Sequence, residues 1–110
     1  PKGYELNPET TKGLQIEYDQ NKACENADFV YVKNWSSYSE YGEILNQDKN
    51  WMMTKKKLGN AKFMHCLPVR RNVVVEDAVL DGAKSLAIEQ ANNRTYSAQV
   101  VLKKILKGIE

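Results

Sequence analysis

The chain has 110 residues and a net charge of +2, with 42% hydrophobic and 27% charged residues; these values predict one folded domain and exclude a disordered chain. Its 16 basic and 14 acidic residues are interspersed, so no strong overall field favours nucleic acid as a partner. No apolar stretch approaches the length of about 20 residues that spans a bilayer. Two cysteines, in a sequence with no recognisable secretory signal, predict a reduced, cytoplasmic protein that does not bind membranes.

The amino end is predicted to be a loop that leads into a short helix. Asn7 is a suitable N-cap, and Pro8 is favoured at the first helical position, where its missing amide proton would have no partner. No strand-like run precedes this helix. In a domain whose sheet is otherwise regular, this order suggests that the chain begins partway through a larger fold.

Two strand-like runs follow, separated by a helix. Residues 14–18 alternate apolar and polar side chains, and Asp19 then caps a helix that we expect to end near Asn26. Residues 28–33 are a nearly continuous apolar run, which is typical of a strand covered on both faces. The segment 34–46 is too long for a simple connection, and such loops in α/β domains often carry function.

A helix is expected after this loop. Asp48 is its predicted N-cap, Trp51 and Met52 are predicted core contacts, and Gly59 can end the helix in the left-handed conformation. The three lysines at 55–57 are open to interpretation as a nucleic-acid patch. A solvated helix end is the favoured interpretation, because cations are stabilised near helix C-termini.

The rest of the chain is predicted to form two strands and two helices. Residues 62–65 form a short strand, a helix over 76–80 is closed by Gly82, and residues 85–88 form a fourth strand. The stretch 91–106 carries apolar side chains at the spacing of one helical face. This alternation predicts an α/β domain with a mainly parallel sheet of about four strands.

The most informative stretch is His65-Cys66-Leu67-Pro68-Val69-Arg70-Arg71-Asn72, which begins at the end of a predicted strand. Ligand-binding groups of an α/β sheet lie at the carboxyl ends of its strands. Pro68 ends the ladder because it lacks an amide donor. Guanidinium groups bind phosphate or carboxylate through two parallel hydrogen bonds. The two arginines therefore indicate either a small anionic ligand or surface salt bridges.

His65 and Cys66 also invite other interpretations. A nucleophile and base pair is disfavoured, because adjacent residues of a strand point to opposite faces. A structural zinc site is disfavoured, because it needs four ligands and the chain has one histidine and two cysteines. A buried, satisfied histidine beside a small buried cysteine remains open.

Two further cations are placed near this stretch by the predicted elements. Lys33 ends the strand at 28–33, on the same rim of the sheet as His65, where it would either bind a carboxylate or be solvated. Arg94 stands at the predicted start of the last helix, where unpaired amides attract anions. Arg94 would therefore form either a phosphate-binding corner or a surface salt bridge.

The string His65-Cys66-Leu67-Pro68 resembles the signature of the aspartate/ornithine carbamoyltransferases, and its extension through Asn72 resembles the transcarbamylases of N-acylated ornithine. The similarity also covers residues 3–8, 17–19, 32–35 and 91–94. It implies that residues 1–110 are one partial domain, the carboxyl-terminal, amino-acid-binding domain of an N-acetylornithine or N-succinylornithine carbamoyltransferase. The implied fold is a three-layer, Rossmann-like domain that lacks its first strand and helix.

The resemblance also implies an activity in arginine biosynthesis. The carbamoyl group of carbamoyl phosphate passes to the side-chain amine of the N-acylated ornithine, in a homotrimeric enzyme without a cofactor or a metal. The implied catalytic residues are His65 at the carbamoyl oxygen, Cys66 at the carbamoyl group and Arg94 at carbamoyl phosphate. The implied substrate-binding residues are Lys33, Trp35, Leu67 and Arg70.

One departure from the ornithine enzymes has a physical meaning. The resemblance implies an Asp-x-Trp motif in those enzymes at the position where this chain has Lys33-Asn34-Trp35. A carboxylate there would pair with a free α-ammonium, whereas an acylated α-nitrogen is neutral and leaves a carboxylate that suits a lysine. The chain thus favours N-acylornithine over ornithine. At position 74 this chain has Val74, where the resemblance implies a lysine in acetyl-specific relatives. This difference favours the succinyl group.

The family's phosphate-binding motif, which resembles Ser-x-Arg-Thr, does not occur in the sequence. We therefore expect the amino-terminal carbamoyl-phosphate domain to be a missing partner and the isolated chain to show no turnover. The alternative is a non-catalytic α/β fragment or scaffold with vestigial site residues.

Overall fold

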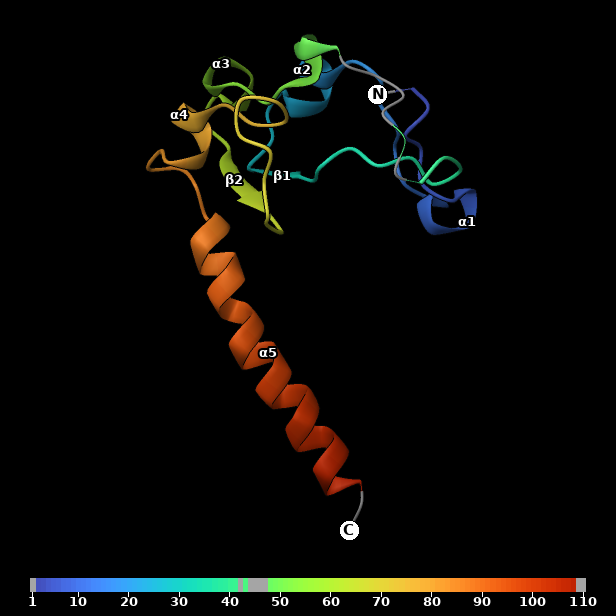
Figure 1. The fold of residues 1–110 in the computed structure, drawn as a ribbon, viewed down its shortest axis with the longest axis vertical. Helices are drawn as coiled ribbons and strands as arrows, with labels where there is room; N and C mark the ends of the chain where they lie inside the picture. The colour runs from blue at the N-terminus through green and yellow to red at the C-terminus, as the bar shows by residue number, and fades with distance from the viewer. Residues whose placement is uncertain (1, 42, 44–47, 109–110) are drawn as a thin grey trace.

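The computed structural model describes residues 2–41, 43 and 48–108. Its elements are α1 (Pro8–Thr11), α2 (Gln20–Cys24), β1 (Phe29–Val32), the 3₁₀ turn η1 (Lys49–Trp51), α3 (Lys55–Leu58), β2 (Lys62–His65), α4 (Asp77–Leu80) and α5 (Ala87–Lys107). The short elements from α2 to α4 cluster together, and α5 projects away from them (Figure 1). The radius of gyration is 16.5 Å, against about 13 Å for a compact domain of about 100 residues.

A parallel pair of strands forms the centre of the cluster. Phe29 of β1 lies opposite Lys62 of β2, and Val32 lies opposite His65. A third segment touches β2 at one point, where Phe63 forms a parallel bridge with Ser85. The predicted α/β class with a parallel sheet is confirmed, but the described residues contain two strands rather than about four.

Two predicted strands are wrong, because neither segment pairs with a neighbouring strand along its length. Residues 14–18 form no strand, and the side chains of Leu14 and Ile16 are 66% and 55% exposed. At 85–88, pairing is limited to the bridge between Ser85 and Phe63, in which the Phe63 amide donates to the Lys84 carbonyl and the Leu86 amide donates to the Phe63 carbonyl. The chain then leaves the sheet, because α5 begins at Ala87. Alternating polarity indicates a segment that could form a strand. The strand forms only where a neighbouring strand is available for backbone hydrogen bonds.

The strand β1 has one open face. Phe29 and Tyr31 are 62% and 55% exposed, whereas Val30 and Val32 are half-buried and pack against the core. The prediction that this strand is covered on both faces is therefore wrong for the described residues. The side chains on its exposed face are apolar, so the sequence alone does not distinguish this face from a buried one.

The helix predicted from Asp48 to Gly59 is divided into η1 and α3. Thr54 caps α3, and its hydroxyl accepts a hydrogen bond from the Lys57 amide at 3.3 Å. Gly59 ends the helix with a φ of 57°, as predicted. The fully buried methionine is Met53 rather than Met52.

Lys57 explains the division. Its ammonium donates to the Met52 carbonyl at 3.1 Å, to the Asn50 carbonyl and to Gln20 Oε1 at 2.7 Å. These carbonyls therefore face a side chain instead of a helical ladder. These bonds tie α2 and η1 to α3. Because Lys57 is half-buried, the prediction of a solvated lysine run is wrong at this position.

The other local predictions agree with the structure in part. Asn7 and Asp19 cap α1 and α2 through their side chains, and α4 ends as expected before Gly82. Of the predicted loop at 34–46, the described residues 34–41 and 43 form no helix or strand, and residues 42 and 44–46 lie outside the described part. Within the described residues, no helix combines the length and apolar character of a membrane span.

The core lies between the sheet and the short helices. Phe63 and Val75 have no exposed surface. The other buried apolar residues are Met53, Leu58, Ala61, Val74, Val79 and Ala87. The carboxyl end of β2 packs in this core, and the candidate site starts at that end of the strand.

Candidate functional site

The candidate site lies at the carboxyl edge of the two-stranded sheet. Because Val32 and His65 are paired in a parallel register, Lys33 and Cys66 leave the sheet on the same edge. The sequence predicted this shared rim, and the strand pairing confirms it.

His65 is fully buried, at 0% exposure. Its Nδ1 accepts a hydrogen bond from the Leu67 amide at 2.9 Å. An amide is always the donor, so Nδ1 carries no proton and the neutral ring has its proton on Nε2. Nε2 has no partner among the residues that the structure describes. The ring therefore holds one buried N–H donor whose hydrogen-bond partner is not among the described residues.

The surroundings of His65 favour its neutral form. The Phe63 ring stacks at a centroid distance of 6.4 Å, and burial lowers the pKa of His65 below its ordinary value of 6.5. A depressed histidine pKa means that the unfolded chain binds more protons than the folded chain in the window just below pH 6.5. Stability is thus greatest above that pH and decreases as the pH falls.

We predict that the free energy of unfolding decreases between pH 7 and pH 5 in the wild-type protein. His65→Asn keeps an acceptor for the Leu67 amide but cannot titrate, so its stability should change less over this range. Urea unfolding at a series of pH values measures both slopes. A wild-type stability that rises on acidification would contradict the depressed pKa.

Cys66 and Leu67 follow His65 with contrasting exposure. Cys66 is exposed, while His65 is buried, so the two side chains have opposite exposure as strand alternation predicts. Leu67 is half-buried against the core and has a φ of 48°. Trp35, on the other rim segment, is also half-buried against the core. All three thus stand at the rim where the sequence placed them.

The two arginines of the signature stretch behave differently. Arg71 Nη1 contacts Asp77 Oδ1 and Asp81 Oδ2, both at 2.7 Å, and Nη2 bonds to Asp81 Oδ1 at 2.8 Å. These bonds raise the pKa of Arg71 and lower the pKa of both carboxyls. The salt-bridge interpretation therefore holds for Arg71, which anchors the stretch to α4.

Arg70 and Lys33 remain available. Both are exposed, and neither side chain has a hydrogen bond or ion pair with another described residue. They follow neighbouring strands at the edge of the sheet where β2 ends at His65. The rim therefore carries two exposed cations whose side chains have no ion pair among the described residues.

Arg94 lies elsewhere in its helix than predicted. The helix α5 begins at Ala87 rather than at residue 91, so Arg94 is about two turns inside it. The predicted phosphate corner at a helix N-terminus is therefore wrong, because the first helical amides, at 87–89, lie almost two turns before Arg94 and the Gln90 amide already donates to the Leu86 carbonyl. The structure shows no hydrogen bond between Arg94 and the signature stretch.

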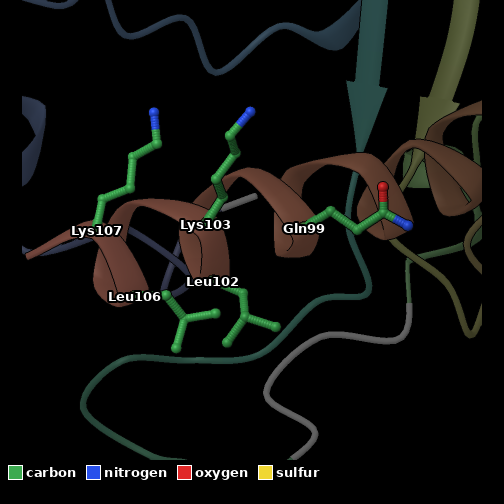
Figure 2. Close-up of a pocket in the computed structure, with 5 residues that line it drawn as sticks. All are labelled: Gln99, Leu102, Lys103, Leu106 and Lys107. Atoms are coloured by element: carbon green, nitrogen blue, oxygen red, sulfur yellow. The ribbon is translucent and has the colours of Figure 1, made fainter. Parts of the chain in front are cut away.

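A recess on α5 lies apart from these residues. Figure 2 shows Lys103 and Lys107 pointing to one side of the helix, with Leu102 and Leu106 on the other side. Together with Gln99 they line the recess, and none of the predicted site residues does. All of its described lining residues belong to one exposed helix, so these residues do not converge on a point from different elements.

Sequence reasoning missed two parts of the site. Asn34 donates from Nδ2 to the Pro68 carbonyl at 2.9 Å and accepts from the Arg70 amide at 3.3 Å. Asp77 and Asp81 hold Arg71, and their spacing of four residues on a helix is a signal that could have identified a carboxylate pair. No local sequence pattern predicts the hydrogen bonds of Asn34.

The Asp/Orn-binding domain of the aspartate/ornithine carbamoyltransferases matches residues 2–105. An N-succinylornithine carbamoyltransferase of Bacteroides thetaiotaomicron is 48% identical and covers the whole chain, which corresponds to 36% of that protein. An N-acetylornithine carbamoyltransferase of Xylella fastidiosa is 33% identical over 86% of the chain and 31% of that protein.

A crystal structure of acetylornithine transcarbamylase complexed with acetylcitrulline has a TM-score of 0.74 and 31% identity, covering 86% of this chain and 34% of that one. The chain thus spans about a third of the length of these relatives. The domain match, the identity and the shared fold place the chain in the aspartate/ornithine carbamoyltransferase family, in its Asp/Orn-binding domain.

Proposed function

We propose that residues 1–110 form the amino-acid-binding part of a carbamoyltransferase that acts on N-acylated L-ornithine, in arginine biosynthesis. The observation that carries the proposal is the pair of cations, Lys33 and Arg70, that have no ion pair among the described residues and follow the sheet edge that also holds the buried His65 donor. Because the chain spans about a third of its relatives, a further carbamoyl-phosphate domain would complete the site. The assembly would be a homo-oligomer.

The two cations suit the α-carboxylate of the substrate. Charge-assisted hydrogen bonds to a carboxylate are the strong class of hydrogen bond. The resemblance implies an aspartate in the ornithine enzymes at the position of Lys33. An acylated α-nitrogen is neutral, so it would leave that carboxylate without a partner. Lys33 and Arg70 therefore support an N-acylated substrate, with Trp35 flanking it.

His65 suits the carbamoyl group. In the transfer, the side-chain amine of the substrate forms a bond to the carbamoyl carbon, and the bond from that carbon to the phosphate oxygen breaks. The amine loses a proton and phosphate leaves. The His65 Nε2–H would donate to the carbamoyl oxygen, where negative charge develops.

The remaining predicted residues would surround the reacting atoms. Cys66 and the Leu67 carbonyl would lie at the carbamoyl group and the attacking amine. Arg94 would contact carbamoyl phosphate, although its support is the resemblance and not a helix terminus.

The acyl group of the substrate is proposed to be succinyl. The relative named for succinylornithine is 48% identical, against 33% for the relative named for acetylornithine. The side chain of Val74 is 1% exposed and belongs to the core. Val74 thus presents no exposed side chain to a ligand, and the proposal of a succinyl group is supported by the difference in identity.

Lys33→Ala is expected to weaken binding of N-succinylornithine about 10- to 150-fold, the range for losing a hydrogen bond to a charged group. Isothermal titration calorimetry on the intact protein that carries residues 1–110 measures the change. Lys62→Ala is the matched control, because Lys62 lies at the opposite end of β2. Equal losses for both variants would indicate a general charge effect and contradict a carboxylate site at Lys33.

A further inference from the structure

The side chain of Asn34 joins the two segments that form the rim. Its Nδ2 donates to the Pro68 carbonyl at 2.9 Å, and its Oδ1 accepts from the Arg70 amide at 3.3 Å. Asn34 itself follows Lys33 at the end of β1, while Pro68 and Arg70 follow β2. One amide group therefore spans the gap between the chain beside Lys33 and the chain at Arg70.

The strands themselves cannot hold this gap. The parallel ladder ends at Val32 and His65, and Pro68 has no amide proton with which to extend it. Leu67 takes a left-handed conformation with a φ of 48°, which turns the chain out of the sheet. Beyond the ladder, the two bonds of Asn34 replace the missing backbone pairs.

The far side of the signature stretch is held separately. Arg71 is fixed to α4 by Asp77 and Asp81, and Asn72 Nδ2 bonds to Asp77 at 2.7 Å. The main chain of Arg70 thus lies between two anchors, one at Asn34 and one at Arg71. Its guanidinium remains unpaired among the described residues, with its backbone fixed on both sides.

The side chain at position 34 needs one donor and one acceptor at the same time. Asparagine supplies both from a short side chain. An aspartate would have no donor for the Pro68 carbonyl and would add a negative charge next to Lys33. A leucine of similar size would have neither group.

We propose that Asn34 is a positioning residue that sets Lys33 and Arg70 at a fixed separation, so that the two cations together select a ligand carboxylate. The inference rests on the proposed function, because it assigns Lys33 and Arg70 to that carboxylate. Asn34 touches no reacting atom in this scheme. Its effect appears as discrimination between a carboxylate and an uncharged group of the same shape.

The test compares the affinities of N-acetylornithine and its α-carboxamide for the intact protein carrying residues 1–110. The acetyl ligand is used because it has no second carboxylate. The wild-type protein should bind the acid at least about 10-fold more tightly than the amide. Asn34→Leu should weaken the acid by about that factor and leave the amide unchanged, which brings the ratio close to one.

Two further variants complete the experiment. Asn21→Leu makes the same change at an exposed position of α2 and should leave both affinities unchanged. Asn34→Ser is too short to reach both partners and should also lower the ratio; it serves if the leucine variant does not fold. A wild-type ratio retained in the Asn34 variants would overturn the inference while the proposed function stands. A wild-type protein without preference for the acid would overturn both.

Discussion

Replacing His65 with asparagine is expected to lower kcat for carbamoyl transfer about 100- to 1,000-fold in the intact protein, the usual effect of removing one donor to a developing oxyanion. The buried ring uses Nδ1 as an acceptor for the Leu67 amide, so the proton on Nε2 is its one donor. Asparagine places an oxygen near the position of Nδ1 and therefore keeps the loop contact. It loses the donor at Nε2.

His65→Gln is the matched variant, because its amide nitrogen reaches the position of Nε2 while the acceptor at Nδ1 is lost. Its activity should exceed that of His65→Asn, while its loop should be less ordered. Steady-state rates of citrulline-type product formation measure the activities. Equal activity of His65→Asn and wild type would contradict a donor role for His65.

Replacing Phe63 with alanine is expected to destabilise the protein by about 3–5 kcal/mol, the range for deleting a buried phenylalanine side chain. Phe63 is 0% exposed, it stacks on His65, and its main chain bonds to Lys84 and Leu86. The deletion therefore leaves a cavity beneath the sheet edge. Denaturant unfolding followed by circular dichroism measures the loss.

Phe29→Ala is the control for this experiment. It removes the same side chain from the open face of β1, where Phe29 is 62% exposed, and should cost about 0.5 kcal/mol or less. Similar losses at the two positions would show that the core is not centred on Phe63.

The sequence predicted the parts of the fold that local chemistry determines. Asn7 and Asp19 cap helices because their side chains reach amides two or three residues away. Gly59 ends α3 because it tolerates a positive φ. The runs at 28–33 and 62–65 became β1 and β2 because they are apolar and pair with each other.

The wrong predictions required knowledge of partners far away in the chain. Residues 14–18 have the polarity of a strand but no strand to pair with among the described residues. At 85–88, a single contact with Phe63 precedes α5, which moved the helix start to Ala87 and displaced Arg94 from it. Pattern alone does not reveal where a neighbouring ladder ends.

The same division applies to the candidate site: its local features were predictable from the sequence, and its long-range contacts were not. Strand alternation separated His65 from Cys66, and the parallel order placed Lys33 on the same rim. The engagement of Arg71 by α4 and the bridge formed by Asn34 depend on tertiary contacts. The chemical roles of the site residues remain predictions.

Carbamoyl transfer by the intact protein carrying residues 1–110 tests the central claim most directly. Initial rates would be measured with carbamoyl phosphate and each of three amines: N-succinylornithine, N-acetylornithine and ornithine. We expect the highest kcat/KM with N-succinylornithine, a lower value with N-acetylornithine and no measurable transfer to ornithine. A kcat/KM for ornithine equal to or above the values for the acylated amines would contradict the assignment of Lys33 and Arg70 to an N-acylated substrate.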